Sequence, residues 1–361
     1  MTNSKNTSKR PLVHVVYEYG IDYRPHSSPF LRLIRPFSHP RVQVHVDTTF
    51  NRDYNEEATD IVIVDRLWRP DVTLPLVQEL VNKIHLKRAK FIYSLDDNFF
   101  DLVLENKGWP PKEYLSIVAF MLHQADSVLV STPALRERLL EYNQNIYVLP
   151  NQLDERLLVI HHPSEIRPQA ESTRIVIGYM GTLTHDEDFL IILPALKSIN
   201  KRYPKLIEVQ VVGVVRSEET KMELQELPVR YIFPQAEEQE YPLFMLWFTG
   251  HVHWDIAISP LRDTPFNRTK SDIKYLDYAA IGAAGIFSQS PAYSSTIHHK
   301  ENGWIAENTT EAWEEALETL ILDNSLRMKL ARNASRYLYS ERILSQRAPE
   351  WVSMVEKLDN A

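Results

Sequence analysis

Two lysines and an aspartate between residues 270 and 277 have the spacing of a binding surface for a phosphorylated ligand. The segment 270–281 contains no proline or glycine, and its apolar residues recur at helical spacing. On a helix, Lys270, Lys274 and Asp277 fall within one narrow arc, away from the apolar residues. The lysines could bind phosphates, and Asp277 could accept hydrogen bonds from sugar hydroxyls. The alternative is a solvated polar helix face.

The expected start of this helix also points to an anion. Thr269, followed three residues later by Asp272, predicts a helix that begins there. Lys270 would then lie in the first turn, where the positive end of the helix dipole disfavours a cation. A phosphate bound to the unpaired N–H groups of that turn would remove this conflict.

This segment resembles the donor-sugar helix of GT-B glycosyltransferases, most closely those of family 4. In that family a carboxylate near the end of the helix is followed by Ala, Gly and a short apolar strand. Residues 277–288, DYAAIGAAGIFS, follow this order. The resemblance implies that Asp277 binds the ribose of a nucleotide. The family's earlier Glu, which contacts the donor sugar, is replaced here by Thr269.

A second candidate site follows a predicted strand that ends in Gly-Tyr-Met-Gly at residues 178–181. Small residues at such a strand end let a ligand approach the backbone. Gly181 and Thr182, followed by His185, resemble a branch of bacterial polysaccharide glycosyltransferases. Family 4 members commonly have Arg and Lys here, and this chain has neither. His185 either donates a hydrogen bond to the donor or is an ordinary residue near a helix start.

Two adjacent aspartates, Asp96 and Asp97, follow another predicted strand, and parallel α/β domains place chemistry at such strand ends. They could contact an acceptor hydroxyl or the donor sugar, act as a base, or simply begin a turn. The GT-B resemblance implies that no metal is needed. Gly20 matches the glycine loop that closes over the donor, whereas Arg66 is expected to be a surface arginine.

The expected site residues form two groups. Because negative charge develops on the leaving pyrophosphate, Lys270 is included among the catalytic residues. The catalytic group is Asp97, Asp96 and Lys270. The donor-binding group is Gly20, Gly181, Thr182, His185, Lys270, Ser271, Lys274 and Asp277.

Composition limits the class of protein. The chain has 361 residues, of which 44% are hydrophobic, and this length favours two domains. Its net charge of −8 argues against a nucleic-acid partner. The absence of cysteine excludes disulfides, thiolate metal sites and a cysteine nucleophile. No run of 18 apolar residues is present, so we expect no membrane span.

Localisation is expected to be cytoplasmic, because the polar N-terminus lacks the apolar core of a signal peptide. A basic cluster could contact anionic lipid at the inner face of the membrane, or be the charged end of a surface helix. The cluster consists of Lys83, His85, Lys87, Arg88 and Lys90.

Apolar strand-like runs alternate with helical ones along the chain, which is the pattern of parallel α/β architecture. Strands are predicted at 12–19, 42–46, 60–64, 90–94, 127–130, 146–149, 175–179, 208–214, 229–233, 255–259 and 284–287. Helices are predicted at 74–85, 114–125, 133–142, 188–202, 218–224, 241–248, 310–322, 325–337 and 341–357. The segment 161–172 has the composition of a linker.

This pattern predicts a disordered tail (1–10), an N-terminal Rossmann-like acceptor domain (11–165) and a C-terminal Rossmann-like nucleotide-sugar domain (173–340). The GT-B resemblance implies that the two domains face a cleft. It also implies that the last helix, 341–361, crosses back to the N-terminal domain, where Trp351 could anchor it.

The expected function is transfer of a hexosyl or deoxyhexosyl group from a nucleoside diphosphate sugar to a hydroxyl acceptor. The acceptor would be a glycan, a lipid-linked precursor or a small molecule, in bacterial surface polysaccharide or glycoconjugate synthesis. No cofactor other than the donor is expected, and family 4 implies retention of anomeric configuration. The alternatives are a nucleotide-sugar epimerase of the same fold and a non-catalytic GT-B binding protein. The non-catalytic reading follows if Thr269, in place of the family's Glu, removes activity.

Overall fold

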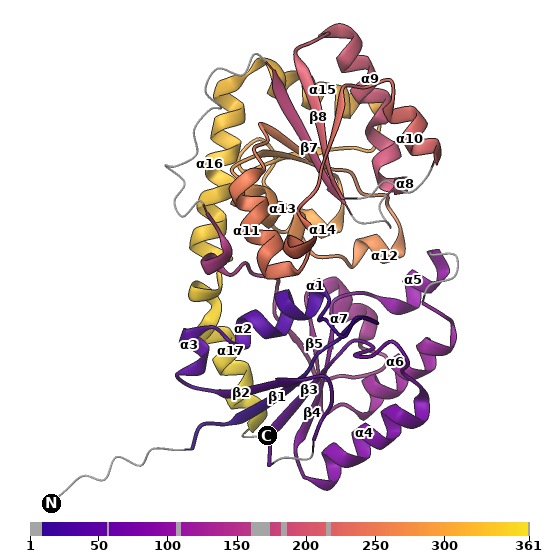
Figure 1. Cartoon of the computed structure of the whole chain (residues 1–361), viewed down its shortest axis with the longest axis vertical. Coiled ribbons are helices and arrows are strands. Elements are labelled where there is room, and N and C mark those ends of the chain that lie inside the picture. Colours follow the sequence, from indigo (N-terminus) through magenta and orange to yellow (C-terminus); the bar gives the residue numbers. More distant parts are fainter. Residues whose placement is uncertain are drawn as a thin grey trace, which may run out of the picture. The chain divides into compact units, whose positions relative to one another are not determined.

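The chain forms two compact units, the first made of residues 1–150 and 347–361 and the second of residues 151–346. The computed structural model (Figure 1) describes residues 9–55, 58–105, 110–159, 174–181, 186–213 and 218–359. The expected linker at 161–172 lies outside these residues.

The first unit is built on a parallel sheet with the strand order β2-β1-β3-β4-β5-β6. Its strands are β1 (Leu12–Val16), β2 (Asp47–Asn51), β3 (Ile61–Asp65), β4 (Lys90–Leu95), β5 (Ser127–Val130) and β6 (Ile146–Val148). After β2 the chain returns to the other side of β1, so the direction of winding reverses between β1 and β3. Ligands of α/β proteins bind beyond the strand ends at such a switch point.

Helices cover both faces of this sheet because the central strands are buried on both sides. One face packs against α4 (Leu74–Leu86), α6 (Glu113–Gln124) and α7 (Pro133–Leu139). The other packs against α2 (Arg35–Phe37), α3 (Pro40–Gln43) and α17 (Leu344–Asp359). Trp351 of α17 is fully buried there, edge-on to Phe37 at 5.3 Å between ring centroids. The short helices α1 (Ser27–Pro29) and α5 (Phe99–Glu105) follow β1 and β4.

The second unit has a parallel sheet of strand order β12-β11-β10-β7-β8-β9. Its strands are β7 (Ile175–Gly181), β8 (Ile207–Gly213), β9 (Val229–Ile232), β10 (Ile256–Ser259), β11 (Ala284–Ser288) and β12 (Trp304–Ala306). Winding starts at β7, runs to β9 and then restarts on the other side at β10. The switch point therefore lies between β7 and β10.

The second unit also has helices on both faces. Its helices are α8 (Asp186–Phe189), α9 (Leu193–Arg202), α10 (Glu218–Leu224), α11 (Tyr241–His251), α12 (Pro265–Arg268), α13 (Ile273–Ala280), α14 (Pro291–Ser294), α15 (Thr310–Leu322) and α16 (Asn324–Glu341). Apolar residues of α9, α15 and α16 form one core with the sheet. On the other face, Tyr275 and Tyr278 of α13 pack against Phe287 of β11.

The alternation of strands and helices predicted from the sequence is confirmed, with local errors. The strand predicted at 42–46 is wrong, because α3 and a turn occupy that segment. His39 accepts a hydrogen bond from the Arg41 N–H, and Pro40 opens the helix. The true strand, β2, has the polar sequence DTTFN and lies at the sheet edge, where alternate apolar residues are not required. The three-residue edge strand β12 was not predicted.

Candidate functional site

Lys274 and Asp277 of α13 lie beside the switch point of the second unit. The Nζ atom of Lys274 is shielded from solvent and has no hydrogen-bond partner among the described residues; it lies 5.1 Å from the centre of the Tyr179 ring. Burial, and then the charge of Lys270, lower the pKa of Lys274 to about 8. Burial raises the pKa of Asp277 to about 7, although the charge of Lys274 opposes this shift. Both groups would gain from a ligand of complementary charge and hydrogen bonding.

The helix that carries them starts later than predicted. Asp272 is the N-cap of α13, so Lys270 and Ser271 lie in the preceding loop and not in the first turn. Thr269 instead ends the one-turn helix α12, which Thr264 caps. The prediction that Thr269 begins the helix is therefore wrong, because two short helices replace one.

Thr269 occupies the position where the family resemblance implies a Glu. Its side chain is buried, and its Oγ1 donates to the Phe266 carbonyl at 2.8 Å. Lys270, the next residue, places its Nζ 4.8 Å from the centre of the Phe266 ring. The side chain of Thr269 therefore bonds to its own loop.

The segment between β10 and α12 is held by a residue that the sequence did not identify as important. Asp188, at the end of α8, is 3% exposed and accepts a hydrogen bond from the Arg262 N–H at 2.9 Å. Tyr278 of α13 ties the two switch-point strands together. Its hydroxyl donates to the Ile258 carbonyl at 2.9 Å and accepts from the Met180 N–H at 3.4 Å. These contacts hold the switch point in one arrangement.

Glycines of β7 and β8 are explained by packing in the same region. A Cβ on Gly178 would lie 1.7 Å from the Trp254 ring, and one on Gly181 would lie 2.7 Å from the Tyr179 hydroxyl. Gly213 has φ +108, and its Cβ would lie 1.9 Å from the Gly181 carbonyl oxygen. Thr182 and His185, two of the expected donor-binding residues, lie outside the described residues.

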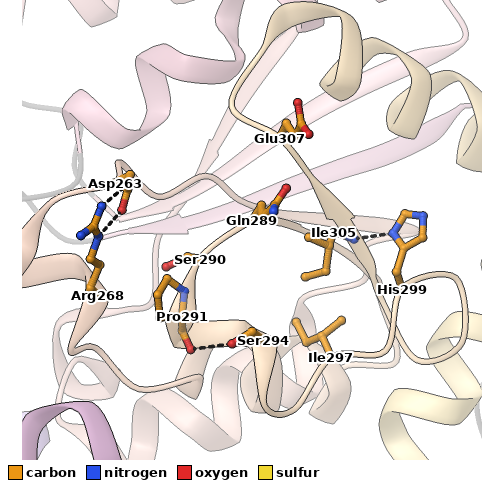
Figure 2. A pocket seen from close by; sticks show the side chains of 10 residues that line it. All are labelled: Asp263, Arg268, Gln289, Ser290, Pro291, Ser294, Ile297, His299, Ile305 and Glu307. Carbon is orange, nitrogen blue, oxygen red and sulfur yellow. Dashed lines mark hydrogen bonds and ion pairs between the residues drawn. The ribbon is translucent and has the colours of Figure 1, made fainter. Parts of the chain in front are cut away.

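A hollow of about 840 Å³ is lined by residues of the segments that follow β10 and β11 and by residues in and around β12 (Figure 2). Arg268 and Asp263 form an ion pair on its rim, with 2.6 Å between Nε and Oδ1. The lining of the hollow combines hydrogen-bonding side chains with apolar ones, which is a combination that suits a polyhydroxylated ligand. The lining residues are Asp263, Arg268, Gln289, Ser290, Pro291, Ser294, Ile297, His299, Ile305 and Glu307.

At the switch point of the first unit, Arg66 gathers three carboxylates. Its Nη1 lies 3.0 Å from Asp96 Oδ1 and 3.3 Å from Asp97 Oδ2, and its Nε lies 3.2 Å from Glu18 Oε2. The expectation of a surface arginine is wrong: its side chain is 11% exposed. Burial would lower the pKa of Arg66, but the carboxylates around it raise the value well above the ordinary one. Its φ of +47 is unusual for a residue with a side chain.

A fourth carboxyl group lies behind this cluster. Asp65, at the end of β3, is 1% exposed, and burial followed by the charges of Glu18 and Asp96 raises its pKa. Ser28 donates a hydrogen bond to Asp96. Asp97 is the most exposed member, at 28% of its side chain, and is therefore the best placed to meet a ligand. Nearby, the Gly20 N–H closes a loop by donating to the Arg24 carbonyl at 2.9 Å.

Metal-ligand clusters and membrane-spanning helices are absent from the part of the chain that the structure describes. In the described parts of the chain, no three His, Cys, Asp or Glu side chains are grouped as metal ligands. Among the described helices, none has both the length and the apolarity needed to cross a bilayer.

No protein-family model matches this sequence, and no curated protein matches it significantly. Similar solved structures include Anabaena HepE in complex with UDP and glucose, with a TM-score of 0.67 and 13% identity over 96% of this chain and 100% of that one. The chain has the GT-B fold.

Two further structures share this GT-B fold over nearly the whole chain. A glycosyltransferase of Rickettsia africae has a TM-score of 0.66 and 12% identity over 97% of this chain and 98% of that one. Sucrose-phosphate synthase of Thermosynechococcus elongatus has a TM-score of 0.65 and 12% identity over 97% and 99%. Each unit of this GT-B chain thus presents polar residues at its own switch point.

Proposed function

We propose that this protein is a glycosyltransferase that moves a sugar from a nucleoside diphosphate sugar to a hydroxyl acceptor. The observation that carries the proposal is the ammonium group of Lys274 beside Asp277, at the switch point of a GT-B second unit: it is shielded from solvent and has no hydrogen-bond partner in the described parts of the chain. A buried cation without a partner is costly, and a bound phosphate would remove that cost.

Different residues of this region bind different parts of the donor. Lys270, Ser271 and Lys274 bind the diphosphate, and Asp277 accepts hydrogen bonds from the ribose. Positive charge here stabilises the leaving nucleoside diphosphate as the glycosidic bond breaks. The hollow in Figure 2 begins at Arg268, directly before this loop, and offers partners for sugar hydroxyls.

In the first unit, Asp97 and Asp96 contact the reacting sugar or the acceptor hydroxyl. Arg66 holds both carboxylates in place, and Asp97 remains partly exposed. We place the protein in family 4, with retention of configuration, no metal requirement and a cytoplasmic location. Its acceptor belongs to bacterial surface polysaccharide or glycoconjugate synthesis, at or near the inner face of the membrane.

A thermal-shift panel with UDP, GDP, dTDP, ADP and CMP tests the donor site. UDP is the first candidate, because HepE was solved in complexes with UDP and with UDP-glucose. A ligand at about 100 times its Kd adds about 2.7 kcal/mol of stability, which is enough for a shift of several degrees. A shift with one diphosphate supports the proposal, and no shift with any of them contradicts it.

The reaction itself is tested with the matching nucleotide sugars. The proposal predicts release of the nucleoside diphosphate that depends on an added acceptor. Conversion of the nucleotide sugar to an isomer without any acceptor would instead identify an epimerase.

A further inference from the structure

The carboxylate of Asp272 does not cap the helix that it precedes. It lies instead against Arg342, whose Nη1 donates to Oδ2 at 2.7 Å and whose Nη2 donates to Oδ1 at 2.8 Å. Thr296 Oγ1 donates to the same carboxylate at 2.6 Å. Arg342 and Asp272 are 4% and 7% exposed. Two parallel bonds in a buried pair fix both the position and the orientation of Asp272.

The same guanidinium group also binds the backbone at Asn151, beside the loop that precedes α13. Its Nε and Nη2 donate to the Asn151 carbonyl at 3.0 and 2.8 Å. The side-chain amide of Asn151 in turn donates to Ser271 Oγ at 2.8 Å. Because Ser271 accepts this bond, its own hydroxyl hydrogen can point elsewhere and donate to an anion. Two consecutive residues of the loop are thus tied to Arg342 and Asn151.

This network lies where the chain enters and leaves the second unit. Asn151 is the first residue of that unit, and Arg342 lies shortly before its end at Gln346. The entering and leaving segments pair through backbone bonds of 2.9 Å, from Leu153 N–H to the Arg342 carbonyl and from Leu344 N–H to the Leu153 carbonyl. Burial would lower the pKa of Arg342, but Asp272 raises it above its ordinary value, so the cation is kept.

We propose that Arg342 and Asn151 are positioning residues for the donor diphosphate. They do not touch the donor; they hold Ser271 and Asp272 so that the serine hydroxyl and the start of α13 face the phosphates. This inference rests on the proposed function and adds two residues that are 120 and 70 positions away from their partners in the loop.

The test compares two variants with a matched control. Arg342→Lys keeps the charge but loses the two-pronged bond, and Asn151→Ala keeps the carbonyl that Arg342 binds but loses the bond to Ser271. The control is Arg327→Lys, because Arg327, on α16, is also a buried arginine, at 7% exposed, but bonds to the Leu320 carbonyl. The probe is the nucleoside diphosphate that wild type binds best, compared with its nucleoside.

Calorimetric titration gives the Kd of the nucleoside and the Kd of the nucleoside diphosphate. The first divided by the second measures how much the phosphates contribute to binding. We expect this ratio to fall at least tenfold in Arg342→Lys and about threefold in Asn151→Ala, with the nucleoside Kd within twofold of wild type. The control should keep the wild-type ratio even if its Tm falls. In a Ser271→Ala background, Asn151→Ala should cause no further loss.

The outcomes distinguish a failure of the proposed function from a failure of the positioning role. If wild type binds none of the diphosphates, the proposed function itself fails. If wild type binds one and both variants keep its ratio, the positioning role is overturned. If Arg342→Lys does not fold, Asn151→Ala alone tests the positioning role, because it leaves the buried ion pair between Arg342 and Asp272 intact.

Discussion

Replacing Lys274 by Met should make the unliganded protein more stable while removing donor binding. The two side chains have similar size, so packing should change little. Lowering the pKa of this lysine from 10.5 to about 8 corresponds to about 3.5 kcal/mol at about 1.4 kcal/mol for each pH unit. Since part of the side chain remains exposed, we expect a gain of about 1 to 3 kcal/mol at pH 7.

The sign follows from proton linkage. The pKa of Lys274 is lower in the folded protein than in the unfolded chain, so between about pH 8 and 10.5 the unfolded chain binds more protons. Wild-type stability therefore rises with pH across this interval as the buried cation loses its proton. The methionine variant lacks this contribution, so its advantage should be full at pH 7 and vanish near pH 10.5.

Urea denaturation at several pH values measures the difference, with Lys270→Met as the matched control. Lys270 lies in the same region and is also half-buried, but its ammonium group, unlike that of Lys274, is not among the buried groups that lack a hydrogen-bond partner within the described residues, so its loss should change stability by no more than about 0.5 kcal/mol. Both variants should lose affinity for the diphosphate. A Lys274→Met protein no more stable than wild type at pH 7 would show that the ammonium already has a partner, and the reasoning would fail.

Three further predictions concern other residues. Because burial holds the pKa of Asp277 at about 7 and an ionised carboxylate is the stronger acceptor, diphosphate affinity should rise from pH 6 to 8 in wild type and much less in Asp277→Asn; equal calorimetric profiles would contradict this. Asp97→Asn should lower kcat about a hundredfold with the diphosphate Kd within twofold, and an unchanged kcat in the transfer assay would remove it from the chemistry. Gly213→Ala should lower the urea midpoint strongly, since its φ is +108 and its Cβ would meet the Gly181 carbonyl. Gly250→Ala, where the nearest atom is at 3.4 Å, should be neutral or stabilising by up to about 1 kcal/mol, and equal losses would refute this.

Most strands and helices could be predicted because burial on both faces leaves a continuous apolar run. The strand Ser127–Val130 and the helices Glu218–Leu224 and Thr310–Leu322 have the predicted bounds. The strand Asp47–Asn51 could not be found in this way, because an edge strand is stabilised mainly by its backbone bonds to β1. Its side chains therefore carry no clear pattern.

The proposed donor site could be predicted only in outline. The spacing of Lys274 and Asp277 indicated one helix face, and both do lie on α13. The start of that helix was misplaced because a separate helix, α12, ends at Thr269 and α13 begins only after Asp272, whose carboxylate is bound by Arg342. No local signal marks this partner, since the two residues are 70 positions apart.

The carboxylate cluster of the first unit could also be predicted only in part from the sequence. Asp96 and Asp97 were identified from their place after a strand, but Arg66 was expected at the surface. Its burial follows from the meeting of the ends of β3 and β4 with the loop after β1, which brings Glu18 to its Nε. Sequence reasoning could have used the position of Arg66 directly after a buried strand as a signal.

The sequence by itself determined the order of strands and helices, the parallel α/β class and the spacing of Lys274 and Asp277, because these depend on local periodicity and backbone preference. Only the tertiary structure decided which charges are buried and which are paired. The free energy of a charge depends on the solvent and the partners around it, and segments far apart in the chain supply both. Lys274 finds no hydrogen-bond partner among the residues that the structure describes, whereas Arg342 has three, in Asp272, Asn151 and Tyr337, although both are ordinary basic residues in the sequence.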